Sequence, residues 1–419
     1  MYWLRDVGWA HSWRQAVFRP FVRVARTPGV ALPVVASFLG ALPIGMLGLG
    51  VLLLVHSTTG SFTAAGLVAG AFSVGNAVGL VTQGHFIDRY GQTRVLVVSG
   101  LLCPAALLGF IACATLHAPL PVIAALALSA GAGLPATTSS LRVLLPLLIG
   151  DPALRNTAYA VLATQFQIAM VAGPLLVSVL VVADGPAFAV LAAAGFACGG
   201  GLLFAAAPAS RRSRLAADVS AVVRRGWLGA GMVTLLVAGF GGGVAAGMMT
   251  VSVPAVAAGH RATALTGLLF AALSAGELVG GLVYGGRPWR LPTSHRLVVG
   301  QTAAALGMAA LALSTQTPPG MLAAMFALGA CVAPTSIASS ALLDDVTPTG
   351  SLARAYTVMV AVGLIGVAAG SALGGTLSTA IGARSVLLIS GGVLGVVALW
   401  TTVRIRWLIV APRRACDVG

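Results

Sequence analysis

Residues 62–116 read FTAAGLVAGAFSVGNAVGLVTQGHFIDRYGQTRVLVVSGLLCPAALLGFIACATL, which is two long apolar runs joined by a short polar loop. Each run is at least as long as the roughly 20 apolar residues that a helix needs to cross a bilayer. The runs do not alternate between apolar and polar residues, which excludes the strands of a membrane barrel. This stretch therefore predicts two membrane-spanning helices connected by a tight turn at the membrane surface.

The same pattern extends through the chain, which has 419 residues, 58% of them apolar and 8% charged. A soluble protein carries about 25% charged residues, and so few charges cannot cover a soluble surface of this size. We therefore predict an all-α membrane protein with twelve transmembrane helices. The predicted spans are residues 29–56, 62–86, 95–116, 119–148, 156–182, 185–206, 227–256, 262–285, 295–314, 318–342, 354–380 and 384–405.

The charges that do occur are mainly positive, with a formal net charge of +15 at pH 7. All 24 basic residues are arginine. If the N-terminus is cytoplasmic, every arginine except Arg261 and Arg384 falls in a cytoplasmic segment or helix end, as the positive-inside rule requires. Arginines spread over short loops on one membrane face do not form a nucleic-acid surface, so no nucleic-acid partner is expected.

Residue usage and charge also predict where the protein resides. The absence of lysine and the bias towards alanine, glycine, valine, leucine and arginine are typical of a bacterial genome rich in G and C. We therefore expect a multi-pass protein of the bacterial cytoplasmic (inner) membrane, with both termini in the cytoplasm.

The longest polar stretch, residues 207–226, divides the chain into two halves of six predicted helices. Six helices per half give both halves the same orientation, as parallel repeats. Residues of the first half recur in order 201 positions later: Gly66, Ser73, Gly75, Gly79 and Arg89 match Gly267, Ser274, Gly276, Gly280 and Arg290. The expected segments are a basic and aromatic N-terminal segment (1–28, an interfacial helix or a flexible tail), two six-helix bundles (29–206 and 227–405), a cytoplasmic linker between them (207–226) and a cytoplasmic tail (406–419).

The polar loop 84–94 carries the most specific motif in the chain, formed by Gly84, Asp88, Arg89, Gly91 and Arg94. Together with twelve helices in two halves, it resembles the cytoplasmic signature of the major facilitator superfamily, Gly-x-x-x-Asp-(Arg/Lys)-x-Gly-x-(Arg/Lys)-(Arg/Lys). The resemblance covers nearly the whole chain. It implies a transporter fold in which this loop is a conformational latch between helices. A plain tight loop with solvated charges is the alternative.

The residue types of this loop have local physical reasons. Gly84 is expected to let a neighbouring helix approach closely, and Gly91 to allow a tight turn. Thr93 departs from the signature, which has a basic residue there. In the second half Trp289 stands where Asp88 stands in the first, so any latch is expected to be asymmetric.

The predicted fifth helix contains Gly173-Pro174. Proton-driven exporters of the superfamily carry Gly-x-x-x-Gly-Pro-x-x-Gly-Gly in this helix, and only the Gly-Pro core matches here. A proline inside a helix frees a backbone carbonyl and kinks the helix. The resemblance favours export, and a kink without directional meaning is the alternative.

Polar residues inside the predicted spans are candidate functional residues, because burying them in a membrane is costly. Glu277 is the only glutamate of the chain and stands at the position that Asn76 occupies in the first half. A lone carboxyl in an apolar helix can exchange protons, which is what a proton-coupled carrier needs. The alternative is a structural glutamate near the cytoplasmic end of its helix, paired with arginine or water.

Five further polar residues are candidates inside the predicted spans. Arg142 in the fourth predicted helix stands where drug exporters of the superfamily often have an arginine linked to proton coupling, and it is otherwise a positive-inside anchor. The side chains of Asn76, Gln83, Gln165 and Gln167 either hydrogen-bond a substrate or bridge helices.

The sequence contains no nucleophile elbow, no metal-spaced His or Cys cluster and no Lys-dependent phosphate loop, so no enzyme activity, no cofactor and no metal is expected. We predict a monomeric secondary transporter that works by alternating access, with proton-coupled efflux of a small hydrophobic or cationic molecule as the first hypothesis. The alternatives are an importer or uniporter on the same fold and, from another class, a non-transporting membrane scaffold or receptor.

Overall fold

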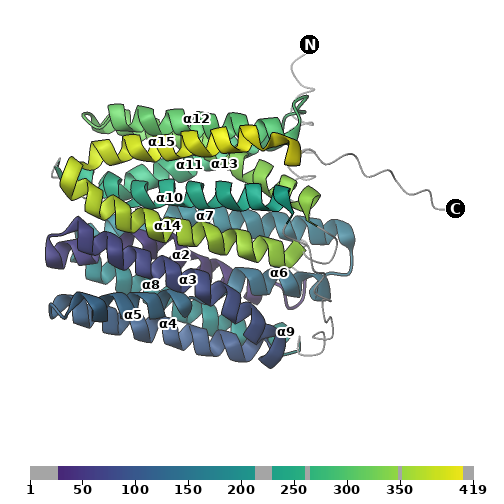
Figure 1. The fold of residues 1–419 in the computed structure, drawn as a ribbon. Coiled ribbons are helices and arrows are strands. Elements are labelled where there is room, and N and C mark those ends of the chain that lie inside the picture. Colours follow the sequence, from purple (N-terminus) through teal and green to yellow (C-terminus); the bar gives the residue numbers. More distant parts are fainter. Residues whose placement is uncertain (1–26, 213–228, 260–264, 348–351, 409–419) are drawn as a thin grey trace, which may run out of the picture.

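The structure is a computed structural model that describes residues 27–212, 229–259, 265–347 and 352–408 (Figure 1). Within these residues the chain is helical without strands, and 12 spans are long and apolar enough to cross a membrane. The prediction of an all-α membrane protein with twelve spans is therefore confirmed. The helices are α2 (Ala31–Thr59), α3 (Phe62–Tyr90), α4 (Gln92–Thr115), α5 (Leu120–Ala132), α6 (Thr137–Leu148), α7 (Pro152–Asp184), α8 (Pro186–Ala206), α9 (Pro208–Arg212), α10 (Ala230–Gly259), α11 (Leu265–Gly285), α12 (Thr293–Leu313), α13 (Pro318–Val346), α14 (Leu352–Ile381) and α15 (Ala383–Val403), followed by a 3₁₀ turn η2 (Ile405–Trp407).

Short caps separate consecutive helices. The Ser61 hydroxyl oxygen accepts a hydrogen bond from the Ala64 N–H at 3.2 Å and so caps the start of α3. Gly91 ends α3 and precedes α4 with a φ of 84°, a backbone conformation that is strained for residues with a side chain. A single residue therefore reverses the chain between these two spans.

The predicted span 119–148 is one apolar run in the sequence but two helices, α5 and α6, in the structure. The break falls at residues 133–136. Pro135 lacks the N–H that a continuous helix requires, and it disfavours helical backbone at the residue before it. The single helix expected over this run is therefore wrong, although α5 and α6 together still form one membrane span.

The backbone groups exposed by this break are bound by Gln83 of α3, which is buried. Its Nε2 donates to the carbonyl oxygens of Ala132 at 3.0 Å and Leu134 at 2.9 Å. Its Oε1 accepts from the Ala136 N–H at 3.2 Å. Of the two roles open to Gln83, the structure shows the bridging of helices.

Helices α2–α8 pack against one another and α10–α15 do the same, so two groups of helices lie side by side (Figure 1). We call the first group the N-half and the second the C-half. Two helix pairs make most of the contact between them: α3 packs along α14, and α7 packs along α11.

Matched glycines make matched contacts within the two halves. A methyl group added at Gly75 would meet the Leu128 carbonyl oxygen of α5, and one added at Gly276 would meet the Phe326 carbonyl oxygen of α13. Small residues allow such close helix approach in membranes. The 201-residue repeat therefore corresponds to equivalent packing of α3 on α5 and of α11 on α13.

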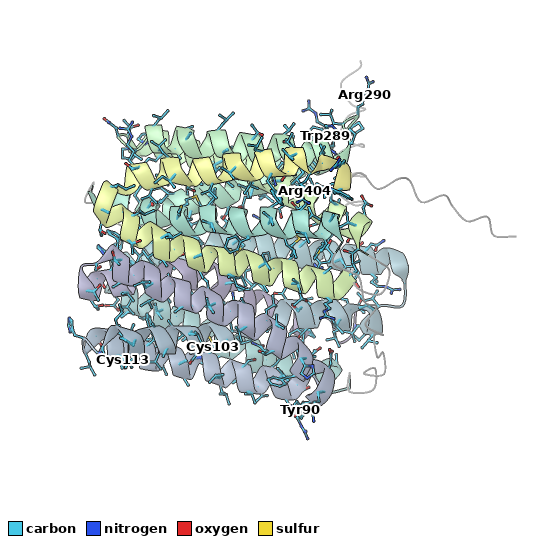
Figure 2. The ribbon with its side chains drawn as sticks, in the orientation of Figure 1. Tyr90, Cys103, Cys113, Trp289, Arg290 and Arg404 are labelled. Atoms are coloured by element: carbon cyan, nitrogen blue, oxygen red, sulfur yellow. The ribbon has the colours of Figure 1, made fainter. Side chains whose placement is uncertain are left out.

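Arginines gather at one end of the helices, the end at which Figure 2 labels Arg290. We call this end the arginine-rich face. Among the described residues it carries Arg89, Arg94, Arg142, Arg155, Arg211, Arg212, Arg287, Arg290, Arg296, Arg354, Arg404 and Arg406. Arg384 lies at the opposite end, at the start of α15. Arg261, residues 1–26, residues 213–228 of the predicted linker and the tail from 409 lie outside the described residues.

Candidate functional site

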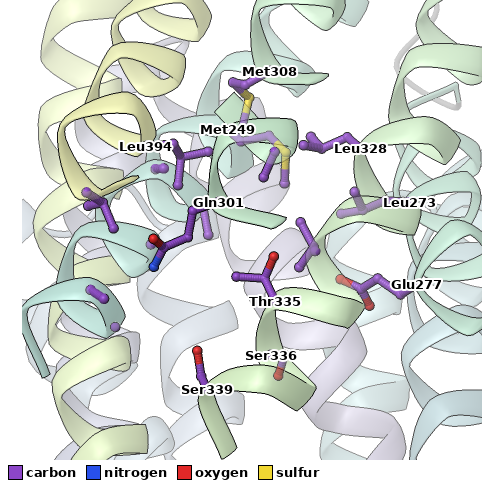
Figure 3. Close-up of a pocket in the computed structure, with 18 of the residues that line it drawn as sticks. Met249, Leu273, Glu277, Gln301, Met308, Leu328, Thr335, Ser336, Ser339 and Leu394 are labelled. Carbon is purple, nitrogen blue, oxygen red and sulfur yellow. The ribbon is translucent and has the colours of Figure 1, made fainter. Parts of the chain in front are cut away.

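The C-half contains a cavity of about 370 Å³ between α10, α11, α12, α13, α14 and α15 (Figure 3). Alanine, glycine, leucine and methionine make up most of its walls, and Met249 and Met308 lie at one end of it. The polar side chains that line it are Glu277, Gln301, Thr335, Ser336 and Ser339. The cavity is therefore mainly apolar, with its polar groups on α11, α12 and α13.

The sequence interpretation missed Gln301, Thr335, Ser336 and Ser339, and of these Gln301 carries the amide. Its side chain is 4% exposed, and its Oε1 has no hydrogen-bond partner among the described residues. It lies eight residues, or about 12 Å, inside α12 from the arginine-rich face. The signal that could have found it is the one that singled out Glu277, a polar residue inside an apolar run.

Gln167 of the N-half and Glu277 of the C-half meet where α7 packs on α11. The Glu277 carboxylate accepts a hydrogen bond from the Gln167 side chain. The Gln167 Nε2 also donates to the Ser274 carbonyl oxygen at 3.3 Å. Glu277 lies about 12 Å, or roughly two turns, from the end of α11. Two candidates chosen separately from the sequence are thus in contact across the halves.

Pro174 contributes to the same contact. Because proline has no N–H, the Met170 carbonyl oxygen one turn earlier lacks its partner within α7. The Ser274 Oγ of α11 donates to this oxygen at 3.2 Å. On another side of α7, Gly173 packs directly on the backbone of Gly45 in α2. The Gly173-Pro174 pair therefore fixes α7 within the N-half and supplies an acceptor to the C-half.

The close glycine contacts between the halves lie towards the end opposite the arginine-rich face. Gly66 of α3 lies against the Ser371 carbonyl oxygen of α14, and Gly267 of α11 lies against the Pro174 carbonyl oxygen of α7. The two glycines are equivalent positions of the repeat. A larger residue does not fit at either position without displacing a helix, so these contacts close the two halves together at this end.

The other intramembrane candidates lie apart from the α7–α11 contact. Gln165 donates from its Nε2 to the Ser37 Oγ at 3.1 Å and so bridges α7 to α2 inside the N-half. Asn76 is half-buried on α3. Arg142 is exposed on α6, close enough to the Tyr356 hydroxyl of α14 for an electrostatic interaction between the halves.

The loop 84–94 lies at the arginine-rich face, with its charged side chains exposed. A methyl group added at Gly84 would meet no atom within 4 Å, so the close helix approach expected there is wrong for this conformation. Asp88 has no hydrogen bond or ion pair to any other described residue, and the Arg89 guanidinium lies over the Tyr90 ring at 5.4 Å. The charged part of the motif is therefore not engaged with another helix.

The α4 side of this loop is attached to α9. The Thr93 Oγ1 lies 3.2 Å from the Ser210 Oγ, and the Gln92 Nε2 donates to the same oxygen at 3.3 Å. Arg94 and Arg211 line a shallow pocket beside these residues. Thr93, which departs from the expected basic residue, therefore holds the start of α4 to a helix that follows the last span of the N-half.

Comparison with known proteins gives one family and one fold. A sequence model of the Major Facilitator Superfamily matches residues 34–287, and no curated protein sequence matches the chain. The crystal structure of the nucleoside transporter NupG has a TM-score of 0.71 at 13% identity, covering 89% of this chain and 98% of its own. That of a D-xylose-proton symporter has a TM-score of 0.70 at 17% identity, covering 89% and 97%. A POT family transporter in complex with a thioalcohol-conjugated peptide has a TM-score of 0.69 at 12% identity, covering 91% and 96%. At such identities these likenesses show the fold alone.

Proposed function

The chain belongs to the major facilitator superfamily, and on that premise we propose that it is a secondary transporter that moves a small molecule across the membrane by alternating access. Two parallel repeats can rock against each other about a site near the membrane midplane. The observation that carries the proposal is the contact of Gln167 and Met170 with Glu277 and Ser274, which joins the halves beside the cavity.

Protons are the proposed source of energy, and Glu277 is the proposed proton-binding residue. It lines the cavity and accepts a hydrogen bond from the opposite half. Its charge therefore affects both the cavity and the contact between α7 and α11. A hydrogen bond to an ionised acceptor is about twice as strong as one between neutral groups. Protonation of Glu277 would therefore weaken its bond to Gln167 and favour separation of α7 from α11.

Efflux is the proposed direction of transport, supported by the match of Gly173-Pro174 to the helix-5 motif of proton-driven exporters. The proposed substrate is a small hydrophobic or cationic molecule, because the cavity walls are mainly apolar and Glu277 is the one charged side chain in the cavity lining. The protein is proposed to act as a monomer and without a cofactor.

The arginine-rich face is proposed to lie in the cytoplasm of a bacterium, with the protein in its inner membrane and both termini on the cytoplasmic side. Arginine in short loops is retained on the cytoplasmic side of membranes. In this orientation the close contacts of Gly66 and Gly267 close the halves on the outer side.

Transport is tested with the full-length protein in liposomes that contain a pH-sensitive dye. Neutral aromatic compounds and amphipathic cations such as ethidium are added under an imposed pH gradient of either sign. We expect dye-reported proton movement and uptake of at least one compound that protein-free liposomes do not show. A folded, reconstituted protein that moves none of them under either gradient would support a scaffold or receptor instead.

A further inference from the structure

We infer that the Asn76 side chain of α3 binds the substrate between the two halves and selects a neutral group that both donates and accepts a hydrogen bond, such as a carboxamide. The inference rests on the proposed transport function and deepens it, because it names a specificity-determining residue and the chemical class that this residue recognises. It comes from the difference between the two contacts that join the halves, α7 on α11 and α3 on α14.

The two contacts are equivalent under the sequence repeat. Gly267 of α11 lies against the Pro174 carbonyl oxygen of α7. Gly66 of α3 lies against the Ser371 carbonyl oxygen of α14. Gly267 follows Gly66 by 201 positions, and Ser371 follows Pro174 by 197. Other residues of α7 recur in α14 at the same offset of 197 positions: Ala158, Tyr159, Ala172 and Gly173 are matched by Ala355, Tyr356, Ala369 and Gly370.

Asn76 is turned towards the interior of the protein. Leu67 and Val78 of α3 are exposed, and so are the residues that match them in α11, Leu268 and Val279. Both helices therefore present the same side outward. At 3.6 residues per turn, Asn76 lies about 180° around α3 from Leu67 and about 160° from Val78. Its side chain therefore leaves α3 on the side opposite the exposed one, as the side chain of Glu277 does on α11.

The amide that holds Glu277 has no counterpart beside Asn76. Gln167 of α7 donates to the Glu277 carboxylate. The residue of α14 that follows Gln167 by 197 positions is Leu364, which cannot hydrogen-bond through its side chain. The position equivalent to Glu277 thus carries a polar residue without the polar partner that the repeat would supply.

The serines of the two contacts differ in the same direction. Ser274 of α11 donates across the boundary to the Met170 carbonyl oxygen. Its match in α3 is Ser73, whose hydroxyl donates to the Ala69 carbonyl oxygen of its own helix at 3.0 Å. At the depth of Asn76 the contact of α3 on α14 therefore lacks both of the polar bonds that the other contact makes.

The Asn76 amide is open to a ligand. Asn76 is half-buried, makes no hydrogen bond to another described residue, and retains accessible surface at both polar atoms of its side chain. Polar groups inside proteins are almost always hydrogen-bonded. Asn76 is also the central residue of α3, at the depth where alternating access places a substrate between two repeats. A substrate bound there would supply the missing partner.

The chemistry of the amide sets the class of ligand. An asparagine side chain offers two N–H donors and a carbonyl acceptor and carries no charge. A carboxamide or lactam pairs with both kinds of atom at once, whereas an ester or ether pairs only with the donors. The rest of the molecule is mainly apolar, in keeping with the proposed hydrophobic substrate.

The test is equilibrium binding to the full-length protein in nanodiscs, with empty nanodiscs as the blank. The probes are 2-naphthamide, which donates and accepts, and methyl 2-naphthoate, which has nearly the same shape but only accepts. We expect 2-naphthamide to bind about tenfold more tightly, because the ester leaves the Asn76 carbonyl oxygen unpaired. Equal affinities, or no saturable binding of either probe, would overturn the inference.

Removal of the amide locates the preference. Asn76→Ala should lower the affinity for 2-naphthamide about tenfold and leave that for methyl 2-naphthoate unchanged. Thr82→Val is the matched control, because Thr82 is exposed on α3 and its hydroxyl donates to the Val78 carbonyl oxygen of the same helix at 2.8 Å. A preference for the amide that survives Asn76→Ala, or an equal loss in Thr82→Val, would contradict the assignment.

A second variant tests the comparison of the two contacts. Leu364→Gln should provide Asn76 with a partner from α14, as Gln167 provides one to Glu277. That partner would compete with the ligand, so the affinity for 2-naphthamide should fall about tenfold while the affinity for methyl 2-naphthoate is retained. An unchanged preference in this variant would contradict the equivalence on which the inference depends.

Flux separates this inference from the proposed function. Asn76→Ala should raise the KM for 2-naphthamide about tenfold, and at saturating probe it should still respond to a pH gradient because the proton is assigned to Glu277. Preferential binding without any flux in the wild type would contradict the proposed function alone. Flux of both probes with equal KM would contradict this inference alone.

Discussion

Ser274 of α11 donates its hydroxyl hydrogen to the Met170 carbonyl oxygen of α7 at 3.2 Å, across the boundary between the two halves. The acceptor lacks its partner within α7 because Pro174 has no N–H. One turn further along α11, Glu277 accepts from Gln167. A proline in one half thus creates a polar attachment point for the other, next to the only glutamate of the chain.

Removal of the Ser274 hydroxyl should favour the conformation in which this contact is open. Hydrogen bonds between membrane helices contribute about 0.6 kcal/mol on average, so Ser274→Ala should change the ratio of the two conformations about threefold. Pulsed electron spin resonance between labels at positions 116 and 313, both exposed at the end opposite the arginine-rich face, measures that ratio. The five native cysteines are replaced by alanine for labelling.

Thr302→Val is the matched control, because the Thr302 hydroxyl is exposed and donates to the Val298 carbonyl oxygen of its own helix at 2.9 Å. It should leave the ratio unchanged. An equal shift in both variants would mean that the bond to Met170 does not hold the halves together.

Larger residues at Gly66 or Gly267 should prevent closure of the same end. An added side chain would meet the Ser371 carbonyl oxygen in one case and the Pro174 carbonyl oxygen in the other. Gly66→Leu and Gly267→Leu should each reduce flux about tenfold or more, because the larger side chain forces the two helices apart at this contact. Gly195→Ala, on the exposed side of α8, where an added methyl group meets no atom within 4 Å, should retain the wild-type flux. Wild-type flux in both leucine variants would show that closure at this end is not part of transport.

Gln83→Leu should destabilise the protein without changing the cavity, because Gln83 is not one of the residues that line it. It removes the bonds to Ala132, Leu134 and Ala136 that bind the broken fourth span. Three such bonds amount to about 2 kcal/mol, which should appear as a lower midpoint of denaturation in detergent. Gln301→Leu is the comparison, because that buried amide oxygen has no partner, and its loss should not lower the midpoint. Equal losses in both variants would contradict the role assigned to Gln83.

Asp88→Asn should destabilise the other conformation of the transporter, in which the arginine-rich ends of the two halves are close together. If loop 84–94 is a latch, Asp88 is bound only when the arginine-rich ends of the halves approach, since it is unpartnered among the described residues. Its loss should favour the present conformation by about 0.5–1 kcal/mol, or two- to fivefold, in the same spin-label measurement. Asp184→Asn, exposed at the opposite end, is the control. No shift in Asp88→Asn would favour a plain solvated loop.

The fold could be predicted from the sequence because membrane spans depend on local runs of apolar residues. The break in the span 119–148 could not, because Pro135 occurs in the interior of an apolar run where many membrane helices continue past a proline. Whether the helix breaks there depends on a partner, and Gln83 is distant in sequence. The repeat pattern predicted equivalent positions, and glycine contacts such as that of Gly75 on Leu128 show how they pack.

The candidate site could be predicted only in part. Glu277 and Gln167 were each singled out as polar residues in apolar helices, but their contact depends on how α7 and α11 pack between the halves. Gln301 carries the same signal and was missed, since its run 295–314 reads as an ordinary span. Its amide oxygen is unpartnered among the described residues, and the residue lines a cavity between six helices, which no local pattern contains.

The most direct test of the proposed mechanism is proton-coupled flux in liposomes for Glu277→Gln beside the wild type. Glutamine keeps the shape of the side chain but does not bind a proton near neutral pH. Wild-type protein should accumulate substrate against its gradient when a pH gradient is imposed, whereas Glu277→Gln should show only downhill exchange that is indifferent to the pH gradient. Asn76→Ala, at the repeat-related position of the N-half, should retain the response to the pH gradient. Gradient-driven accumulation by Glu277→Gln at the wild-type rate would contradict the assignment of Glu277 as the proton-binding residue.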